Sequence, residues 1–288
     1  MKWYLLGCLF AIQSLGAFSQ EGVLFYVGST ETSGWQIFRY DFASRKSTQL
    51  SFSAGDKRNP QYCRGLRVVT CRDSLGQIIQ VNGAKESLLL TNLSGCSNYS
   101  VTQDGRSVYF TKPAPEKRRQ DIWVQRVPEA SAPELVASVP EGMLKQVCVS
   151  PNGRWLAATH IWRPNEERLV LIPAKEGKPI DYLTPDRSLD AFPQWTADSE
   201  CILFSMTTAT GKYSISKVCL RDKQIETLRP NPSMNECNPA TDSAGQFVFF
   251  EQRTPEGSVI ACLDTKAHEV GQLPMPHESK EPFWYENK

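Results

Sequence analysis

Histidine is scarce in this chain of 288 residues, where only His160, His268 and His277 occur. Three scattered histidines argue against a centre in which several imidazoles bind one metal ion. Cysteine pairs of the Cys-x-x-Cys type and the Cys/His spacings of zinc sites are also missing. We therefore expect neither a bound metal nor another cofactor.

Charge of one sign is not in excess, since 32 Lys and Arg stand against 31 Asp and Glu. The chain thus lacks the basic surplus with which proteins attract nucleic acid or an anionic membrane. It also lacks a Gly-x-Ser-x-Gly elbow, and no spacing of its acidic residues fixes two carboxyl groups for hydrolysis. These absences predict a protein that is not an enzyme and does not bind nucleic acid.

The only long apolar run lies at the N-terminus and has the features of a secretory signal. Lys2 gives it a positive start, residues 3–18 are mostly apolar, and Ala17 and Ser19 are the small residues that a signal peptidase accepts. This run is shorter than the roughly 20 residues of a membrane-spanning helix. We expect a signal peptide at residues 1–19, cleavage after Ser19, and a periplasmic or secreted protein that does not span a membrane.

Eight of the nine cysteines follow residue 19, an even number that permits disulfides in an exported protein. Cys201 and Cys219 lie nearly symmetrically about a turn expected at residues 209–211, so they could be neighbours on paired strands. The alternative is that they are buried free thiols, because Cys219 and Cys262 occupy the same position of a sequence repeat. The sequence leaves both interpretations open.

That repeat is the most informative feature of the chain. Its clearest copies are residues 101–110, 149–158, 195–204 and 241–250, with a shortened copy at 62–71 and the start of a sixth at Trp284. The aligned residues are 39 to 48 positions apart, and they are Tyr62, Val101, Val149, Trp195, Thr241 and Trp284. A period of about 40–45 residues that contains short strands is the signature of a β-propeller.

Each repeat contains four strand-like segments. The innermost strand holds the aligned residue, and a tight turn such as Asp104-Gly105 or Asn152-Gly153 follows this strand. Every strand type appears six times, so we expect an all-β, six-bladed propeller of four-stranded blades over residues 20–288. The chain begins with a second-type strand at 23–27 and ends with an innermost strand at 282–285. We expect these two to pair and to close the ring, because closure removes exposed sheet edges.

The repeat resembles that of the TolB-type six-bladed propeller family, whose repeats are WD-like. The matching residues are Pro193-Gln194-Trp195, Ser150-Pro151-Asn152-Gly153, Asp104-Gly105 and Ile37-Phe38-Arg39-Tyr40-Asp41. The resemblance covers residues 23–288 and concerns the propeller part of that family only. It implies the fold and leaves the activity open, because many unrelated functions share such rings.

In a propeller, the loops that enter the innermost strands share one face with those that join the second and third strands, and ligands usually bind on this loop face. Two hairpins, at 112–119 and 160–164, could form one wall of Arg, Lys and Trp there. The alternative is a solvated hairpin tip, with structural roles for His160 and Trp162. The candidate binding residues are Arg58, Asn98, Lys117, Arg118, Arg119, Lys145, His160, Trp162, Arg163, Asp190, Phe192, Asn238 and Glu281.

The sequence as a whole favours an exported, non-enzymatic propeller that binds a protein or peptide partner of the cell envelope through this loop face. A carbohydrate-binding propeller, or a divergent glycan-cleaving one, is the alternative, because oligosaccharides stack on aromatic side chains.

Overall fold

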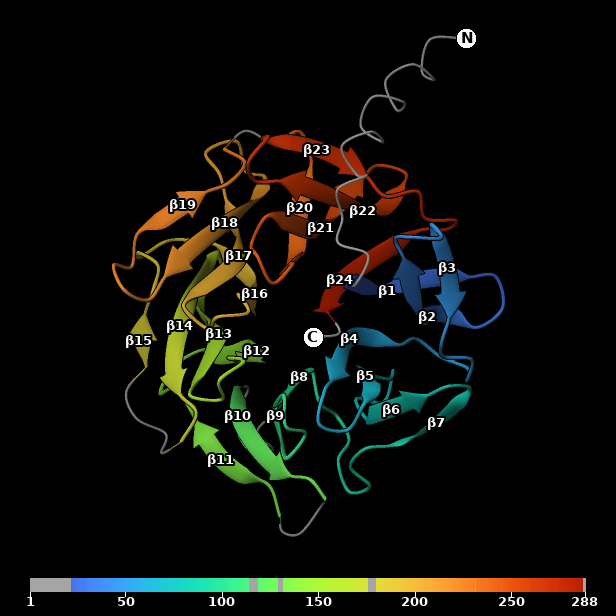
Figure 1. Cartoon of the computed structure of the whole chain (residues 1–288). Helices are drawn as coiled ribbons and strands as arrows, with labels where there is room; N and C mark the ends of the chain where they lie inside the picture. Colours follow the sequence, from blue (N-terminus) through green and yellow to red (C-terminus); the bar gives the residue numbers. More distant parts are fainter. Residues whose placement is uncertain (1–21, 114–118, 129–131, 176–179, 231, 287–288) are drawn as a thin grey trace.

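The computed structural model describes residues 22–113, 119–128, 132–175, 180–230 and 232–286. These residues form six four-stranded antiparallel sheets, which stand as blades in a ring around a common centre (Figure 1). The predicted all-β, six-bladed propeller is therefore confirmed.

The strands of each blade are given from the innermost outward. Blade 1 consists of β24 (Ser279–Glu286), β1 (Gly22–Thr30), β2 (Gly34–Asp41) and β3 (Lys46–Gln49). Blade 2 consists of β4 (Arg58–Cys63), β5 (Val68–Arg72), β6 (Ile78–Asn82) and β7 (Lys85–Leu88). Blade 3 consists of β8 (Asn98–Val101), β9 (Ser107–Pro113), β10 (Gln120–Arg126) and β11 (Glu134–Ala137). Blade 4 consists of β12 (Met143–Val149), β13 (Trp155–Arg163), β14 (Glu166–Pro173) and β15 (Asp181–Tyr182). Blade 5 consists of β16 (Asp190–Trp195), β17 (Cys201–Thr207), β18 (Tyr213–Cys219) and β19 (Ile225–Thr227). Blade 6 consists of β20 (Asn235–Thr241), β21 (Phe247–Thr254), β22 (Gly257–Asp264) and β23 (Glu269–Gln272).

The two ends of the described chain close the ring in blade 1, as the sequence predicted. β24 pairs antiparallel with β1, and Leu24 lies opposite Trp284 while Val23 lies opposite Tyr285. The C-terminal strand is longer than the predicted 282–285, since it begins at Ser279. The closing blade therefore combines three strands from the start of the sequence with one from its end (Figure 1).

The hydrophobic core consists of six clusters, one between each pair of neighbouring blades. Strand β1 shows how one strand serves two of them, because successive side chains of a strand point to opposite faces. Leu24 and Tyr26 pack against blade 6, whereas Phe25 and Val27 pack against blade 2. Burial on both faces explains why residues Gly22 to Gly28 are all buried. The blades are thus held together chiefly by apolar contacts between their faces.

The structure decides between the two interpretations of the cysteines. Cys201 and Cys219 lie directly opposite each other on β17 and β18, and their sulfur atoms, 2.03 Å apart, form a disulfide. The other six cysteines of the described residues are free, and burial raises the pKa of each of their thiols. These six thiols are Cys63, Cys71, Cys96, Cys148, Cys237 and Cys262.

The predicted signal peptide lies in residues 1–21, outside the described residues. Within the described ranges, no helix is long and apolar enough to cross a membrane.

Candidate functional site

The central channel is lined by three rings of residues, and each ring contains one equivalent residue from every blade, on its innermost strand or in the turn that follows it. The loop-face ring contains Asn59, Asn98, Gln146, Phe192, Asn238 and Glu281. The middle ring contains Gln61, Ser100, Cys148, Gln194, Ala240 and Phe283. The turn-face ring, at the opposite end, contains Arg64, Gln103, Pro151, Ala197, Ser243 and Glu286. A cavity of about 250 Å³ lies at the loop face and one of about 350 Å³ at the turn face, and the two share several middle-ring residues.

Five members of the loop-face ring have an unusual backbone. Their φ angles lie between 51° and 58°, the left-handed region that residues other than glycine rarely adopt. A register shift between the innermost and second strands accompanies each of them. Such a conformation costs roughly 1–3 kcal/mol per residue and is concentrated at functional sites. These five residues are Asn59, Gln146, Phe192, Asn238 and Glu281.

Hydrogen bonds between neighbouring blades and within one blade hold this ring in place. The Glu281 carboxylate accepts a hydrogen bond from the backbone N–H of Asn59 at 2.6 Å, and the Gln146 side-chain oxygen accepts one from the N–H of Phe192 at 2.8 Å. The Asn238 amide nitrogen donates to Glu251 at 2.7 Å, which leaves the Asn238 side-chain oxygen for the cavity. Asn98 Oδ1 is buried and accepts no hydrogen bond from the described residues. The loop-face cavity therefore presents the Asn238 side-chain oxygen beside the aromatic rings of Phe192 and Phe283.

The structure brings five of the candidate binding residues to this mouth. Four of them line the cavity, namely Asn98, Phe192, Asn238 and Glu281. Arg58 lies beside it, with a guanidinium nitrogen 3.5 Å from the Glu281 carboxylate. Asn59 and Gln146, which the alignment of the repeats also places in the loops that enter the innermost strands, complete the ring. A recurring X-Pro step, as at 59–60, 192–193, 238–239 and 281–282, marks the ring in the sequence.

Two carboxyl groups lie behind the ring, at equivalent positions of β16 and β20. Asp190, a candidate binding residue, is fully buried and accepts a hydrogen bond from Ser188 Oγ at 2.6 Å. Glu236 is also fully buried, with Arg229 Nε 3.0 Å from its carboxylate. Burial raises the pKa of Asp190 to about 6 and, despite Arg229, that of Glu236 to about 7. Both groups support the ring from inside their blades and do not line the cavity.

Replacing Glu236 with Gln is expected to reduce the loss of stability that the protein undergoes as the pH rises from 5 to 8. A carboxyl group whose pKa is higher in the folded state than in the unfolded state favours folding when protonated, so the unfolding free energy falls between pH 4.5 and about 7. The corresponding change is roughly 2–3 kcal/mol for Glu236. Urea denaturation at pH 5, 6, 7 and 8 measures it. Equal pH slopes for the two proteins would contradict the assignment.

The basic and aromatic wall expected on blades 3 and 4 is not evident among the described residues. Arg119 turns inward, where it pairs with the buried Asp121 at 3.3 Å and donates to the carbonyl of Val139. His160 is fully buried and bonds Tyr182 Oη at 2.8 Å. Trp162 is 36% exposed and meets the His160 ring edge-on.

Four further candidate binding residues remain, namely three of the expected wall and Lys145 of an entry loop. Lys117 and Arg118 lie outside the described residues. Arg163 is exposed at the end of β13, and Lys145 is half-buried next to Gln146 on β12. Of the expected wall, the described residues leave Trp162 and Arg163 on the surface.

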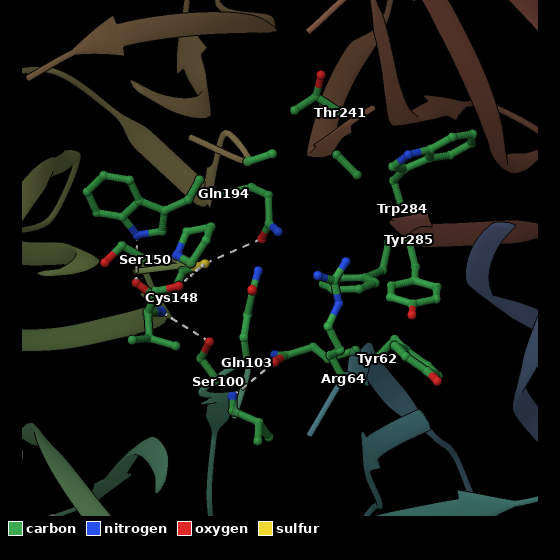
Figure 2. Close-up of a pocket in the computed structure, with 18 of the residues that line it drawn as sticks. Tyr62, Arg64, Ser100, Gln103, Cys148, Ser150, Gln194, Thr241, Trp284 and Tyr285 are labelled. Atoms are coloured by element: carbon green, nitrogen blue, oxygen red, sulfur yellow. Dashed lines mark hydrogen bonds between the residues drawn. The ribbon is translucent and has the colours of Figure 1, made fainter. Parts of the chain in front are cut away.

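The turn-face mouth was not selected from the sequence, although it is the larger of the two cavities. Figure 2 shows Arg64 and Gln103 extending into it, with Arg64 next to Tyr285. The ring centres of Tyr62 and Tyr285 are 3.9 Å apart. Arg64 and Gln103 occupy the same turn position in two successive repeats. A charged residue at a turn position that faces the channel is the sequence signal that could have identified Arg64.

Within the ranges that the structure describes, no group of three or more His, Cys, Asp or Glu residues could hold a metal ion.

No protein-family model matches this sequence, and no curated protein sequence matches it. Among solved structures, TolB from Acinetobacter baumannii is similar with a TM-score of 0.78 and 17% identity, over 95% of this chain and 69% of that chain. A putative TolB from Agrobacterium tumefaciens has a TM-score of 0.72 and 13% identity, over 93% and 98% of the two chains. A chain of a nidogen–laminin complex has a TM-score of 0.69 and 10% identity, over 91% and 98%. At these identities the similarity concerns the fold, and the fold of this chain is that of a TolB-like six-bladed β-propeller.

Proposed function

We propose that this chain is an exported, non-enzymatic propeller that binds a segment of a protein or peptide partner in the loop-face cavity. The observation that carries the proposal is the loop-face ring, in which all six blades bring a residue to one cavity. Five of these residues keep a strained backbone conformation there. Strain of this kind persists only where the surrounding structure enforces it, and it is typical of binding and catalytic sites.

The chemistry of the cavity suits an extended peptide. Such a peptide carries backbone N–H groups that need acceptors, and the side-chain oxygen of Asn238 can provide one. Phe192 offers an aromatic surface for an apolar side chain of the peptide, and Arg253 lies 5.7 Å from the centre of its ring. The occurrence of a chain with a similar fold in a nidogen–laminin complex supports protein binding by such a ring.

The proposal is tested by placing the photo-crosslinking residue p-benzoylphenylalanine at position 192 and irradiating the protein with the envelope fraction of its source. We expect a covalent adduct with one partner protein, identified by mass spectrometry, because the side chain at 192 faces the cavity. The matched control carries the same residue at Leu135, which is 52% exposed on the outer strand β11.

Adducts of equal yield from positions 192 and 135 would show nonspecific contact and would contradict the proposal. Absence of any adduct at 192, together with a rise in melting temperature on adding oligosaccharides, would instead favour the carbohydrate-binding alternative.

A further inference from the structure

The turn-face cavity contains a positive charge, that of Arg64, which forms no ion pair within the described ranges. Arg64 is exposed in the turn after β4 and extends into the cavity (Figure 2). Its guanidinium donates one long hydrogen bond, of 3.4 Å, to the backbone carbonyl of Glu286, and it forms no ion pair with any described residue. The Glu286 carboxylate instead accepts hydrogen bonds from Ser243 and from Trp284 Nε1. The guanidinium is therefore available to an anionic group.

The backbone fixes where Arg64 lies. The N–H of Gly65 donates to the carbonyl of Gln103 at 2.8 Å, which joins the turn of blade 2 to the turn of blade 3. A Cβ atom on Gly65 would lie 2.1 Å from the carbonyl oxygen of Asp104, so only glycine permits this approach. Arg64 and Gln103 thus belong to two turns whose backbones are joined, and both side chains line the cavity.

A third donor reaches the cavity from the middle ring. The side-chain oxygen of Gln194 accepts a hydrogen bond from the Cys148 thiol at 3.4 Å, which leaves the Gln194 amide nitrogen for the cavity. Together with the Gln103 amide and the Arg64 guanidinium, it forms a set of N–H donors. A carboxylate is the group that best matches such a set, because it accepts two parallel hydrogen bonds from one guanidinium.

Aromatic side chains form the wall next to these donors. The Tyr62 and Tyr285 rings are 3.9 Å apart, and the Arg64 guanidinium lies 5.9 Å from the centre of the Tyr285 ring. Trp284 also lines the cavity. The cavity volume of about 350 Å³ is at the small end of the usual range for ligand pockets. The wall can thus pack against the apolar part of a small ligand.

We propose that the turn-face cavity is a second binding site, for a small carboxylate joined to an apolar or ring-shaped group. Arg64, Gln103 and Gln194 bind the carboxylate, and Tyr62, Tyr285 and Trp284 contact the rest of the ligand. The site does not depend on partner binding at the loop face, since it lies at the other end of the channel.

Calorimetric titration of the purified protein with two matched pairs of probes tests this site. The pairs are phenylacetate with phenylacetamide, and N-acetylphenylalanine with its amide. In at least one pair, we expect the acid to bind about 10-fold or more tightly than the amide, because only the acid forms charge-assisted hydrogen bonds with Arg64. Preference for phenylacetate would indicate a free small acid, and preference for N-acetylphenylalanine would indicate the carboxyl terminus of a peptide.

Three variants assign the binding to this cavity. We expect Arg64→Gln to weaken acid binding about 10-fold or more, and Arg64→Lys to weaken it less, because lysine keeps the charge without the paired donors. The control variant Arg154→Gln replaces an exposed arginine in the equivalent turn of blade 4, and it should bind the acid probes as the wild type does. Equal affinity for acids and amides, no binding of any probe at millimolar concentration, or unchanged binding by Arg64→Gln would each overturn the proposal. Melting curves verify that the variants are folded.

Discussion

Deletion of residues 281–288 is expected to abolish the folded monomer. The deletion removes most of β24, the innermost strand of the closing blade, and leaves the edge of β1 without its partner. Trp284 stacks on Phe249 with ring centres 5.0 Å apart, so the deletion also opens the core between blades 6 and 1. Loss of one large aromatic side chain from a core costs about 3–5 kcal/mol. A native protein is stable by only about 5–15 kcal/mol, and three aromatic residues are lost here.

Light scattering coupled to size-exclusion chromatography and thermal melting measure this result. The truncated protein should be aggregated or unfolded, because a bare strand edge pairs with other chains. Deletion of residues 287–288 alone is the control, since it leaves β24 intact. A monomeric 281–288 deletion with unchanged melting would show that the ring does not need its C-terminal strand.

Replacement of Trp195 by Ala is expected to lower the free energy of unfolding by about 3–5 kcal/mol. Trp195 is only 4% exposed and packs in the core between blades 4 and 5. Its indole N–H donates to the backbone carbonyl of Cys148 at 3.0 Å, which links the innermost strands of the two blades. The residue therefore contributes both apolar burial and a hydrogen bond between blades.

The Trp195→Phe variant separates these two contributions. It keeps most of the apolar packing and loses the indole N–H, so we expect a smaller loss of about 1–2 kcal/mol. Urea denaturation of the three proteins measures both differences. Trp195 also borders the turn-face cavity. If Trp195→Ala were as stable as the wild type but no longer bound carboxylate probes, the residue would belong to that site and not to the core.

The candidate site could be predicted in part, and particular residues show where the prediction failed. Phe192, Asn238 and Glu281 were selected because they enter innermost strands, and the repeat places all such positions around one channel mouth. Arg119 and His160 were selected as hairpin residues of the expected wall, with a structural role as the alternative for His160, and each points into its blade and binds groups there. The sequence could not predict this difference, because the direction of a side chain near a hairpin depends on partners that are distant in the sequence.

By itself, the sequence determined the number of blades, the order of their strands and the closure of the ring. These features follow from local signals, since strand alternation and tight turns involve residues close together in the chain, and the repeat multiplies them six times. Only the tertiary structure decided which groups the channel residues contact and which side chains line the turn-face mouth. Asn59 and Glu281 are 222 residues apart in the sequence, and closure of the ring brings the backbone nitrogen of Asn59 to 2.6 Å from the Glu281 carboxylate. The polarity of each channel mouth arises from such contacts between blades, which no single repeat contains.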